Sequence, residues 1–308
     1  DLDLDFARTK SLKDRISKED LITFTRSAGI GTGATYVDEN GLVKVAPVNY
    51  IHNSHNITEE TTGSAIHKWR KFASGAGAAL VITPNHATAP DGTTNATRLQ
   101  FTSGTVDDNK SLLEHRFSSP GTPILAANTH VIISIYLKST DGSNQTLSIS
   151  NISNHRRTIT VTGEWQRFEL KSSRITSDHR LRLGIRNGPS GGLSQVLNTP
   201  DSNGNFANIT RDVLAWGGQA ELADSSIANG LVTGVATELI KTGSQASGAP
   251  RFTHDPYTLE SKGLLIEKAG TNLLIYSEQL DQAEWTKSGG TSITANNVVA
   301  PDGTTTAD

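Results

Sequence analysis

The residues that could carry out chemistry are scattered along this chain of 308 residues. Gly29, Gly31 and Gly33 have the outline of a phosphate-binding loop, but that loop needs its third glycine one residue later, between a strand and a helix. A strand-like segment follows instead, so we interpret these glycines as a flexible turn. The chain has no cysteine to act as a nucleophile, and no set of nucleophile, base and acid stands out. We therefore expect no enzymatic activity in these residues.

Two oxygen-rich segments give weak metal patterns. Asp1 to Asp5 alternates acidic and apolar residues like the opening of a calcium loop, but Phe6 and Leu12 stand where the loop needs glycine and a bidentate glutamate. Asp201 to Asn205 offers a better set of oxygen ligands, and Phe206 interrupts the pattern again. We predict no metal site and no cofactor, with calcium binding by the second segment as an open alternative.

Histidines and adjacent carboxylates do not form a catalytic pattern either. His52 and His55 are the closest pair of the nine histidines, and no His-Glu-x-x-His helix surrounds them. We interpret them as a solvated loop pair. Glu59-Glu60 and Asp107-Asp108 are neighbours in sequence, so on a strand the two members of each pair would face opposite sides. A glycosidase needs two carboxyls about 5–10 Å apart in a cleft, which sequence spacing does not establish.

Sugar binding would call for exposed aromatic rings that stack on sugar faces. Aromatic residues make up only 6% of the chain. Trp165 and Trp216 sit inside strand patterns, and we interpret both as core residues. Trp69 follows an irregular segment, and its role stays open. The sequence therefore names no carbohydrate-binding residue.

The composition favours β structure and excludes several partners. Only 35% of residues are hydrophobic, while threonine and 28 glycines suit pleated surfaces and the turns between them. The 28 basic and 31 acidic residues give a net charge of −3, which is no footprint for nucleic acid. The apolar stretch Val131 to Leu137, interrupted only by Ser134, falls far short of the ~20 residues needed to cross a bilayer. We expect neither a nucleic acid nor a membrane as partner.

The middle of the chain is a series of short strand patterns separated by turns such as Asp91-Gly92 and Asp141-Gly142. Many short strands without a long helical period predict an all-β antiparallel sandwich, or jelly roll, of about 170 residues. The predicted strands are Ala79–Thr83, Ala96–Thr102, Val131–Lys138, Thr146–Ser150, Thr158–Thr162, Gln166–Lys171, Arg180–Arg186 and Val213–Glu221.

The N-terminal segment also has strand-like patterns, but it has too few apolar residues to form a core of its own. The alternation from Asp1 to Phe6 predicts a half-buried strand. Asp38 to Gly41 predicts a turn between two strand-like segments, because Asn-Gly tolerates positive φ. The apolar stripe of Leu2, Leu4 and Phe6 would suit strand addition to a partner protein or to a neighbouring copy of the chain.

An internal repeat extends to the end of the sequence. Asn49 to Ser54 returns as Asn272 to Ser277, and Ala89 to Ala96 returns almost unchanged as Ala300 to Ala307. The second copy ends about 37 residues after it begins, which is too short to bury a sandwich core. We therefore expect the parent protein to continue into a further module. The predicted organisation is an N-terminal segment at 1–48, a sandwich at 49–222, a linker with short strands at 223–271, and the truncated start of a second sandwich at 272–308.

The segments outside the sandwich carry a family resemblance. They resemble the tail-fibre and other appendage proteins of tailed bacteriophages, on the segments Thr35 to Gly41, Pro250 to Pro256, Gly263 to Glu267 and Asn272 to Glu278. In that family the first two segments lie close together in sequence. Here nearly 200 residues intervene, which looks like one inserted sandwich. The sandwich itself resembles carbohydrate-binding-module jelly rolls, on Ile135 to Ser139, Gly163 to Arg167 and Trp216 to Glu221.

The resemblance implies a structural component of a phage virion that attaches to the particle and presents host-binding modules. It implies tail, baseplate or neck proteins as partners, attachment through Leu2, Leu4 and Phe6, and a homotrimer. The location would be the phage particle. Two alternatives stay open, namely a sugar-binding module for host surface polysaccharide and a mount for a C-terminal depolymerase that lies outside this chain.

Overall fold

The structure is a computed structural model. It describes residues 5–13, 16, 26, 34–61, 66–119, 125, 129–151, 155–173, 177–188, 198–223, 227–228, 231–232, 234–267, 280–289, 292–300 and 307. By its internal contacts the chain divides into two units. One consists of Asp1–Arg26, Thr32–Ala46 and Ala249–Asp308, and the other of Ser27–Gly31 and Pro47–Gly248.

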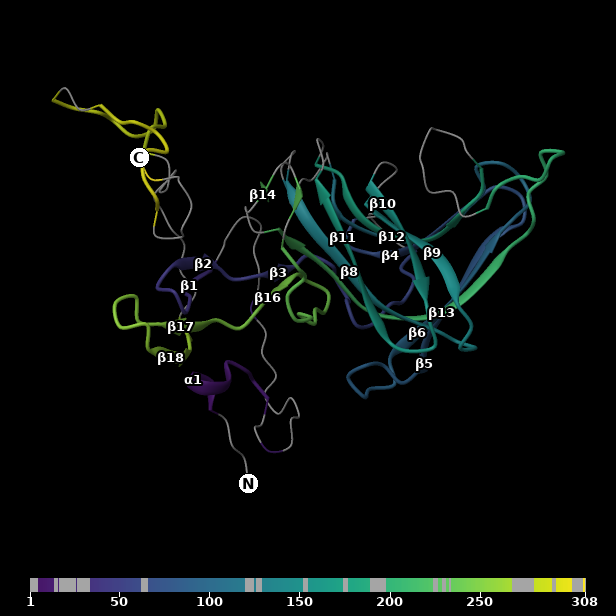
Figure 1. Ribbon diagram of the computed structural model, residues 1–308, viewed down its shortest axis with the longest axis horizontal. Helices are drawn as coiled ribbons and strands as arrows, with labels where there is room; N and C mark the ends of the chain where they lie inside the picture. The colour runs from purple at the N-terminus through teal and green to yellow at the C-terminus, as the bar shows by residue number, and fades with distance from the viewer. Residues whose placement is uncertain are drawn as a thin grey trace. The chain divides into compact units, whose positions relative to one another are not determined.

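The larger unit is an antiparallel β-sandwich of two five-stranded sheets (Figure 1). The first sheet has the order β10-β9-β12-β7-β4, with β4 Trp69–Ser74, β7 Lys110–Ser118, β9 Gln145–Asn151, β10 His155–Val161 and β12 His179–Arg186. The second sheet has the order β11-β8-β13-β6-β5, with β5 Ala78–Ala87, β6 Ala96–Ser103, β8 His130–Ser139, β11 Gln166–Ser173 and β13 Thr210–Leu222. The predicted all-β sandwich is confirmed, and each of the eight predicted strands overlaps an observed one.

The core lies between the two sheets and follows the period-2 alternation of the strands. In β8 the buried residues Ile133, Ile135 and Leu137 all point toward the first sheet, and Leu181 and Leu183 of β12 point back. Each large side chain buried in this way contributes about 1.5–3 kcal/mol. The alternation that predicted these strands is therefore also what packs them together.

Two strands of the first sheet, β4 and β7, were not predicted, because polar residues occupy inward positions. In β7 the fully buried Ser111 and His115 alternate with the apolar Leu113 and Phe117. In β4 only the first residue, Trp69, is buried, and most of the others are exposed. Neither strand shows the clean apolar alternation from which a half-buried strand is predicted.

The described part of the predicted linker belongs in large part to the sandwich unit. β16 (Ser247–Gly248) pairs with β3 (Val48–Asn49), and the side chain of Asn49 donates to the carbonyl oxygens of Gly218 and Ile240 at 3.0 and 2.9 Å. The short strands β14 (Ile227–Ala228) and β15 (Leu231–Val232) form a separate pair. We call residues 234–248 the covering segment, because part of it packs on the second sheet as described below.

The smaller unit brings together two segments that are far apart in sequence. β1 (Thr35–Val37) pairs with β2 (Val43–Val45), and β17 (Phe252–His254) pairs with β18 (Ser261–Leu264). The backbone N–H of Val37 donates to Thr253 Oγ1 at 3.1 Å, and Arg251 donates to the carbonyl oxygen of Thr35 at 2.9 Å. The sandwich is thus inserted, in sequence, between two parts of one contact unit.

The turn between β1 and β2 forms where Asn-Gly predicted it. Asp38 Oδ1 accepts the backbone N–H groups of Asn40 and Leu42, both at 2.9 Å. Gly41 has a φ of +78°, and a Cβ atom there would come within 2.8 Å of the carbonyl oxygen of Pro256. Only glycine meets both requirements without strain.

The predicted strand from Asp1 to Phe6 is wrong at its C-terminal end. Phe6 begins the short helix α1 (Phe6–Thr9), and Asp5 caps it by accepting the backbone N–H of Arg8 at 3.2 Å. The capping side chain offers the backbone a local hydrogen bond that competes with an extended strand. Leu2 and Leu4 lie outside the described residues.

Much of the second repeat copy also lies outside the described residues, including 272–279 and 301–306. Its described parts, 280–289 and 292–300, contain turns and an isolated bridge between Val298 and Ala307. Of the helices in the described residues, none has the length and apolar character needed to span a membrane.

Candidate functional site

A row of polar residues crosses all five strands of the first sheet on its outer face. The register places Arg70 opposite Glu114, Glu114 opposite Arg182, Arg182 opposite Ser150, and Ser150 opposite Arg156. Residues directly opposite one another on antiparallel strands share a face of the sheet. We call these five residues the arginine row.

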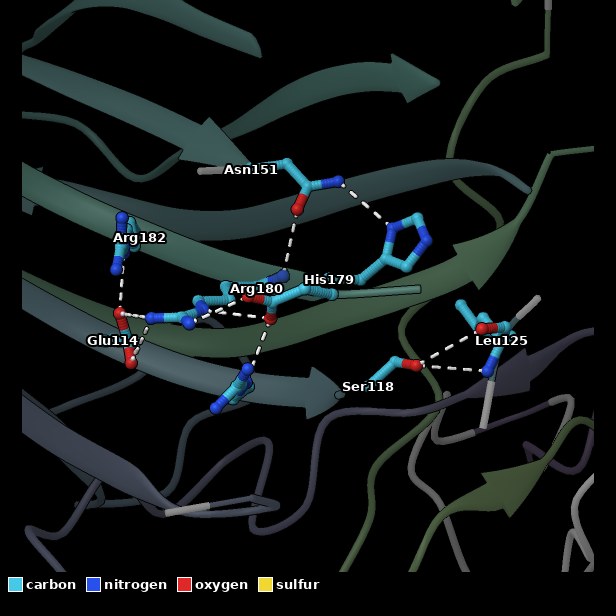
Figure 2. Close-up of polar contacts among 9 residues, drawn as sticks. Glu114, Ser118, Leu125, Asn151, His179, Arg180 and Arg182 are labelled. Atoms are coloured by element: carbon cyan, nitrogen blue, oxygen red, sulfur yellow. Dashed lines mark hydrogen bonds and ion pairs between the residues drawn. The ribbon is translucent and has the colours of Figure 1, made fainter. Parts of the chain in front are cut away.

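Glu114 holds the centre of the arginine row. Its carboxylate accepts from Arg182 Nε at 2.6 Å and from Arg180 Nη1 at 3.0 Å, as Figure 2 shows. The three side chains are only 9–17% exposed. Hydrogen bonds between ionised groups are among the strongest in proteins, so these guanidinium groups are fixed in place before any ligand arrives.

A second carboxylate extends the network along the first sheet. Asp178 accepts from Arg116 Nε at 2.9 Å and from Arg180 Nη2 at 2.8 Å. Burial would raise the pKa of Asp178, but the hydrogen bonds from Arg180 and Arg116 outweigh it and hold the pKa below its usual value. Asp178 is therefore ionised at neutral pH and binds both arginines as a carboxylate.

A side chain on the inner face of the first sheet fixes the backbone of Arg180. Asn151 Oδ1 accepts the backbone N–H of Arg180 at 2.9 Å, and Asn151 Nδ2 lies 3.3 Å from His179 Nδ1 (Figure 2). The same amide donates to Ser172 Oγ of the second sheet at 3.0 Å. Asn151 thus fixes the start of β12, from which the arginines project.

A smaller row runs beside the arginine row. The register aligns Phe72, Leu112, Gly184, Ser148 and Thr158 across the same five strands. Phe72 is 39% exposed, and its ring centroid lies 5.1 Å from the guanidinium carbon of Arg182. An aromatic ring held by a cation and partly open to solvent offers a flat apolar surface next to charged hydrogen-bond donors.

Part of the outer face of the second sheet, around Trp216 and Tyr136, is covered instead. The rings of Trp216 and Tyr136 lie 5.6 Å apart, and Leu239 of the covering segment packs against this cluster. Glu221 accepts from the backbone N–H and the hydroxyl of Thr237, at 2.8 and 2.7 Å. For the described elements, the main contacts of the first sheet's strands are with one another and with the second sheet. No described helix or strand therefore packs extensively on the outer face of the first sheet, which we call the bare face.

This bare face combines preorganised guanidinium groups, hydroxyls and one aromatic ring. Arginine presents a rigid fork of donors that matches paired oxygen atoms, and a few fixed polar groups around an apolar surface are typical of small-molecule sites. The arrangement fits a ligand rich in hydroxyl or carboxylate oxygens. It contains no nucleophile positioned beside a base among the residues just described.

The structure places His52 differently from the solvated pair that we predicted with His55. The ring of His52 stacks on His67 at 4.2 Å, and its backbone N–H donates to Nε2 of the fully buried His115 at 3.2 Å. Burial and the neighbouring His67 lower the pKa of His52 to about 4. The sequence did not indicate this cluster, because its members are 15 and 63 residues from His52. Among the described residues, no three His, Asp or Glu side chains gather closely enough to hold a metal ion.

The other predicted candidates have structural contacts. Glu59 pairs with Lys71 at 2.7 Å. Asp201 Oδ1 accepts the backbone N–H groups of Asn203 and Asn205 at 2.9 and 2.8 Å, which stabilises a turn. Gly29, Gly31 and Gly33 lie outside the described residues.

A serine-containing motif lies just after β12. Residues 188–192 match Gly-x-Ser-x-Gly, but the serine lies outside the described residues and the preceding strand, β12, belongs to an antiparallel sandwich. A nucleophile elbow needs a strand-to-helix turn in an α/β sheet. The fold does not offer that setting.

Trp216 and Trp165, which we interpreted as core residues, both belong to or pack against a hydrophobic cluster. Trp216 is 4% exposed in the covered cluster, and Trp165 packs against the same cluster from the turn before β11. Trp69, whose role the sequence left open, is fully buried and donates to the carbonyl oxygen of Asn53 at 3.0 Å. Phe72 and the arginine row were not predicted. The one available signal was the alternation of arginines with buried residues in Arg180 to Arg186.

The chain matches no protein-family model and no curated protein. Solved structures with a similar chain trace include the xylan-binding CBM22-1 domain from Paenibacillus barcinonensis, at 15% identity and a TM-score of 0.30, over 63% of this chain and 98% of that one. They also include a family 11 carbohydrate-binding module from Clostridium thermocellum, at 12% identity and a TM-score of 0.29, over 58% and 96% of the two chains.

A third similar structure is the enzymatically active domain of tailspike protein 4 from bacteriophage CBA120, at 11% identity and a TM-score of 0.32. The match covers 56% of this chain and 21% of the tailspike chain, so this chain spans about a fifth of that protein's length. The identities and TM-scores are low. These similarities therefore carry no function over to this chain.

Proposed function

We propose that the sandwich binds a glycan on the outer face of its first sheet. The observation that carries the proposal is the arginine row, with Phe72 beside it, on the face that no described element covers. The guanidinium of Arg182, fixed through Nε by Glu114, can donate from its Nη groups to neighbouring sugar oxygens without losing further side-chain freedom. The exposed ring of Phe72 can receive the apolar face of a sugar ring.

The test is binding of the full chain to a glycan array and to surface polysaccharides of bacteria, measured beside the variant Phe72→Ala. We expect at least one glycan to bind, and the variant to bind it about tenfold more weakly, which corresponds to about 1.4 kcal/mol. Lys71→Ala is a matched control, since it lies on the same strand and faces the other side. Absence of binding to every glycan, or equal binding by Phe72→Ala, would overturn the proposal.

We also propose that the chain is a structural component of a bacteriophage virion, such as a tail fibre. This proposal is supported by the sequence resemblance and by the smaller unit, in which β1 and β17 lie together. These strands belong to two of the segments that carry the resemblance. His254 Nδ1 is 3.2 Å from the carbonyl oxygen of Val37, and Gly41 packs on Pro256. In this role the smaller unit attaches to tail, baseplate or neck proteins, with Leu2, Leu4 and Phe6 as part of the contact, and several copies present their sandwiches together. Multivalency would then convert weak single contacts into firm attachment.

Two measurements test the virion proposal. Mass spectrometry of purified phage particles should detect the chain at a constant ratio to the tail proteins, and native mass spectrometry of the full-length protein should give a trimer. A protein that is absent from particles and present only in infected-cell lysate would contradict the proposal. Incubation of full-length protein with host capsule tests the depolymerase alternative, because only that alternative predicts released fragments.

A further inference from the structure

We infer that the glycan bound by the first sheet is anionic, carrying carboxylate or sulfate groups that the arginine row and its neighbours receive. This inference rests on the proposed glycan binding and narrows its substrate class. The charges on the outer face, their positions and the contrast with the rest of the chain support the anionic class.

The outer face of the first sheet has a large excess of positive charge. Among the residues that the structure describes, seven cationic side chains share it, namely Arg70, Lys110, Arg116, Arg156, Arg180, Arg182 and Arg186. The three carboxylates bonded to them are Asp108, Glu114 and Asp178. The difference of seven and three leaves a local charge of +4, on a chain whose total is −3. The excess is therefore local to this face and is not a property of the whole composition.

Each carboxylate in the network is already shared between two cations. Asp108, for example, accepts from Lys110 at 2.9 Å and also from Arg186. A carboxylate bonded twice neutralises only one of its two partners, so the face keeps positive potential even where it contains acids. Positive potential on a protein face attracts and orients anionic ligands.

Arg156 extends the positive charge to the edge strand β10, in register with Ser150 and Arg182. Arg156 of β10 is close enough to Arg182 and Arg186 that burial and the repulsion from these two arginines lower its pKa. Three arginines that repel one another cost free energy in the unliganded protein. An anionic group placed among them would relieve that repulsion, and a neutral sugar would not.

Neighbouring strand positions provide an internal control. Arg157 is adjacent to Arg156 but pairs with Ile149, so it projects from the other side of β10, where it donates to the carbonyl oxygen of Glu169 at 3.3 Å. Arg156→Gln and Arg157→Gln remove the same charge from the same strand. Only the first removes it from the proposed binding face.

The experiment compares polygalacturonate with its carboxyl-reduced form, and dextran sulfate with dextran, by affinity measurements on the full chain. We expect each acidic polymer to bind about tenfold or more tightly than its neutral partner at low salt, and the difference to shrink in 0.5 M NaCl because salt screens exposed charges. Arg156→Gln should weaken binding to the acidic polymers about three- to tenfold, while Arg157→Gln should leave it unchanged. Both variants should melt at temperatures close to that of the wild type.

The outcomes separate the two proposals. Equal binding of acidic and neutral forms, or a glycan array whose bound members are all uncharged, would overturn the anionic class and leave the proposed glycan binding in place. Binding of no polymer and no array glycan would remove the proposed function itself. Equal affinity for single-stranded DNA would show unselective polyanion binding and would also overturn the inference.

Discussion

The two outer faces of the sandwich are built on sheets of the same size, yet they present opposite surfaces. The first sheet carries charged side chains bonded to one another, together with the half-exposed Phe72. The second sheet carries the aromatic pair Tyr136 and Trp216, which the covering segment buries. An apolar outer face needs a cover to leave water, whereas a charged face is stable in contact with water. The difference shows which side of the fold is used for packing and which is available for binding.

The cover of the second sheet is specific as well as apolar. Glu221, Gln219 and Arg167 of the sheet all bond to Thr237 of the covering segment. Glu221 and Gln219 are almost fully buried, so their polar groups must find partners within the protein. A ligand could reach the aromatic pair of Tyr136 and Trp216 only by displacing the covering segment, at the cost of these bonds.

The largest expected effect comes from the covered aromatic residue. Trp216→Ala should lower the free energy of unfolding by about 3–4 kcal/mol, because it leaves a cavity under Leu239. Glycan binding by the protein that remains folded should be unchanged. Urea unfolding and binding titrations measure the two effects, and Phe72→Ala is the matched control, with a loss of stability below about 1 kcal/mol and a clear loss of binding. If both substitutions gave the same loss of stability, the contrast between the two faces would be wrong.

The next effect concerns the centre of the arginine row. Glu114→Ala leaves Arg180 and Arg182, which are mostly buried, without their shared carboxylate. We expect the free energy of unfolding to fall by about 2–3 kcal/mol, since removing one partner of a largely buried ion pair leaves its charges uncompensated. Glu114→Gln keeps the shape and some hydrogen bonding, and it should lose less. An unchanged urea midpoint for Glu114→Ala would mean that the network contributes no stability.

Acid should lower the stability of the sandwich through its histidine cluster. The cluster consists of His52, His67 and His115, and burial lowers the pKa of all three, in His52 to about 4. The unfolded chain binds protons near pH 6.5 and the folded chain does not, so stability is complete above that pH and falls as the pH drops from 6.5 toward 4. Allowing for the partial exposure of His52, we expect a loss of about 1–2 kcal/mol.

Urea unfolding at pH 7.5 and pH 5.0 measures the acid effect, with His52→Asn as the comparison variant. The variant should lose less stability than the wild type over this interval, because one of the proton-binding groups is gone. Asp178 and Asp108, whose pKa values are lowered, titrate below this range and do not obscure it. Equal urea midpoints at the two pH values would contradict the role of the histidine cluster.

The sequence predicted the sandwich because its clearest strands alternate in a way that one sequence segment reveals by itself. Leu181, Leu183 and Ile185 show the inward face of β12 without reference to any other strand. The arginine row is different, because each of its residues comes from a separate strand, and only the register brings them together. The same holds for His52 and His115, which are 63 residues apart. A pattern that exists only across strands has no period along the chain and could not be predicted from it.

The smallest expected effect comes from a direct comparison of one arginine on each of the two outer faces. Arg182 and Arg98 lie on the outer faces of the first and second sheets, and each is bonded to a carboxylate, Arg98 to Asp212 at 2.9 Å. Arg182→Gln should weaken glycan binding about five- to tenfold, because it removes a charged donor from the bare face. Arg98→Gln should leave the affinity within about twofold, since salt screens a charge on the far side of the sandwich. If Arg98→Gln weakened binding as much as Arg182→Gln does, total charge would govern binding, and the position of the arginines on one bare sheet would not.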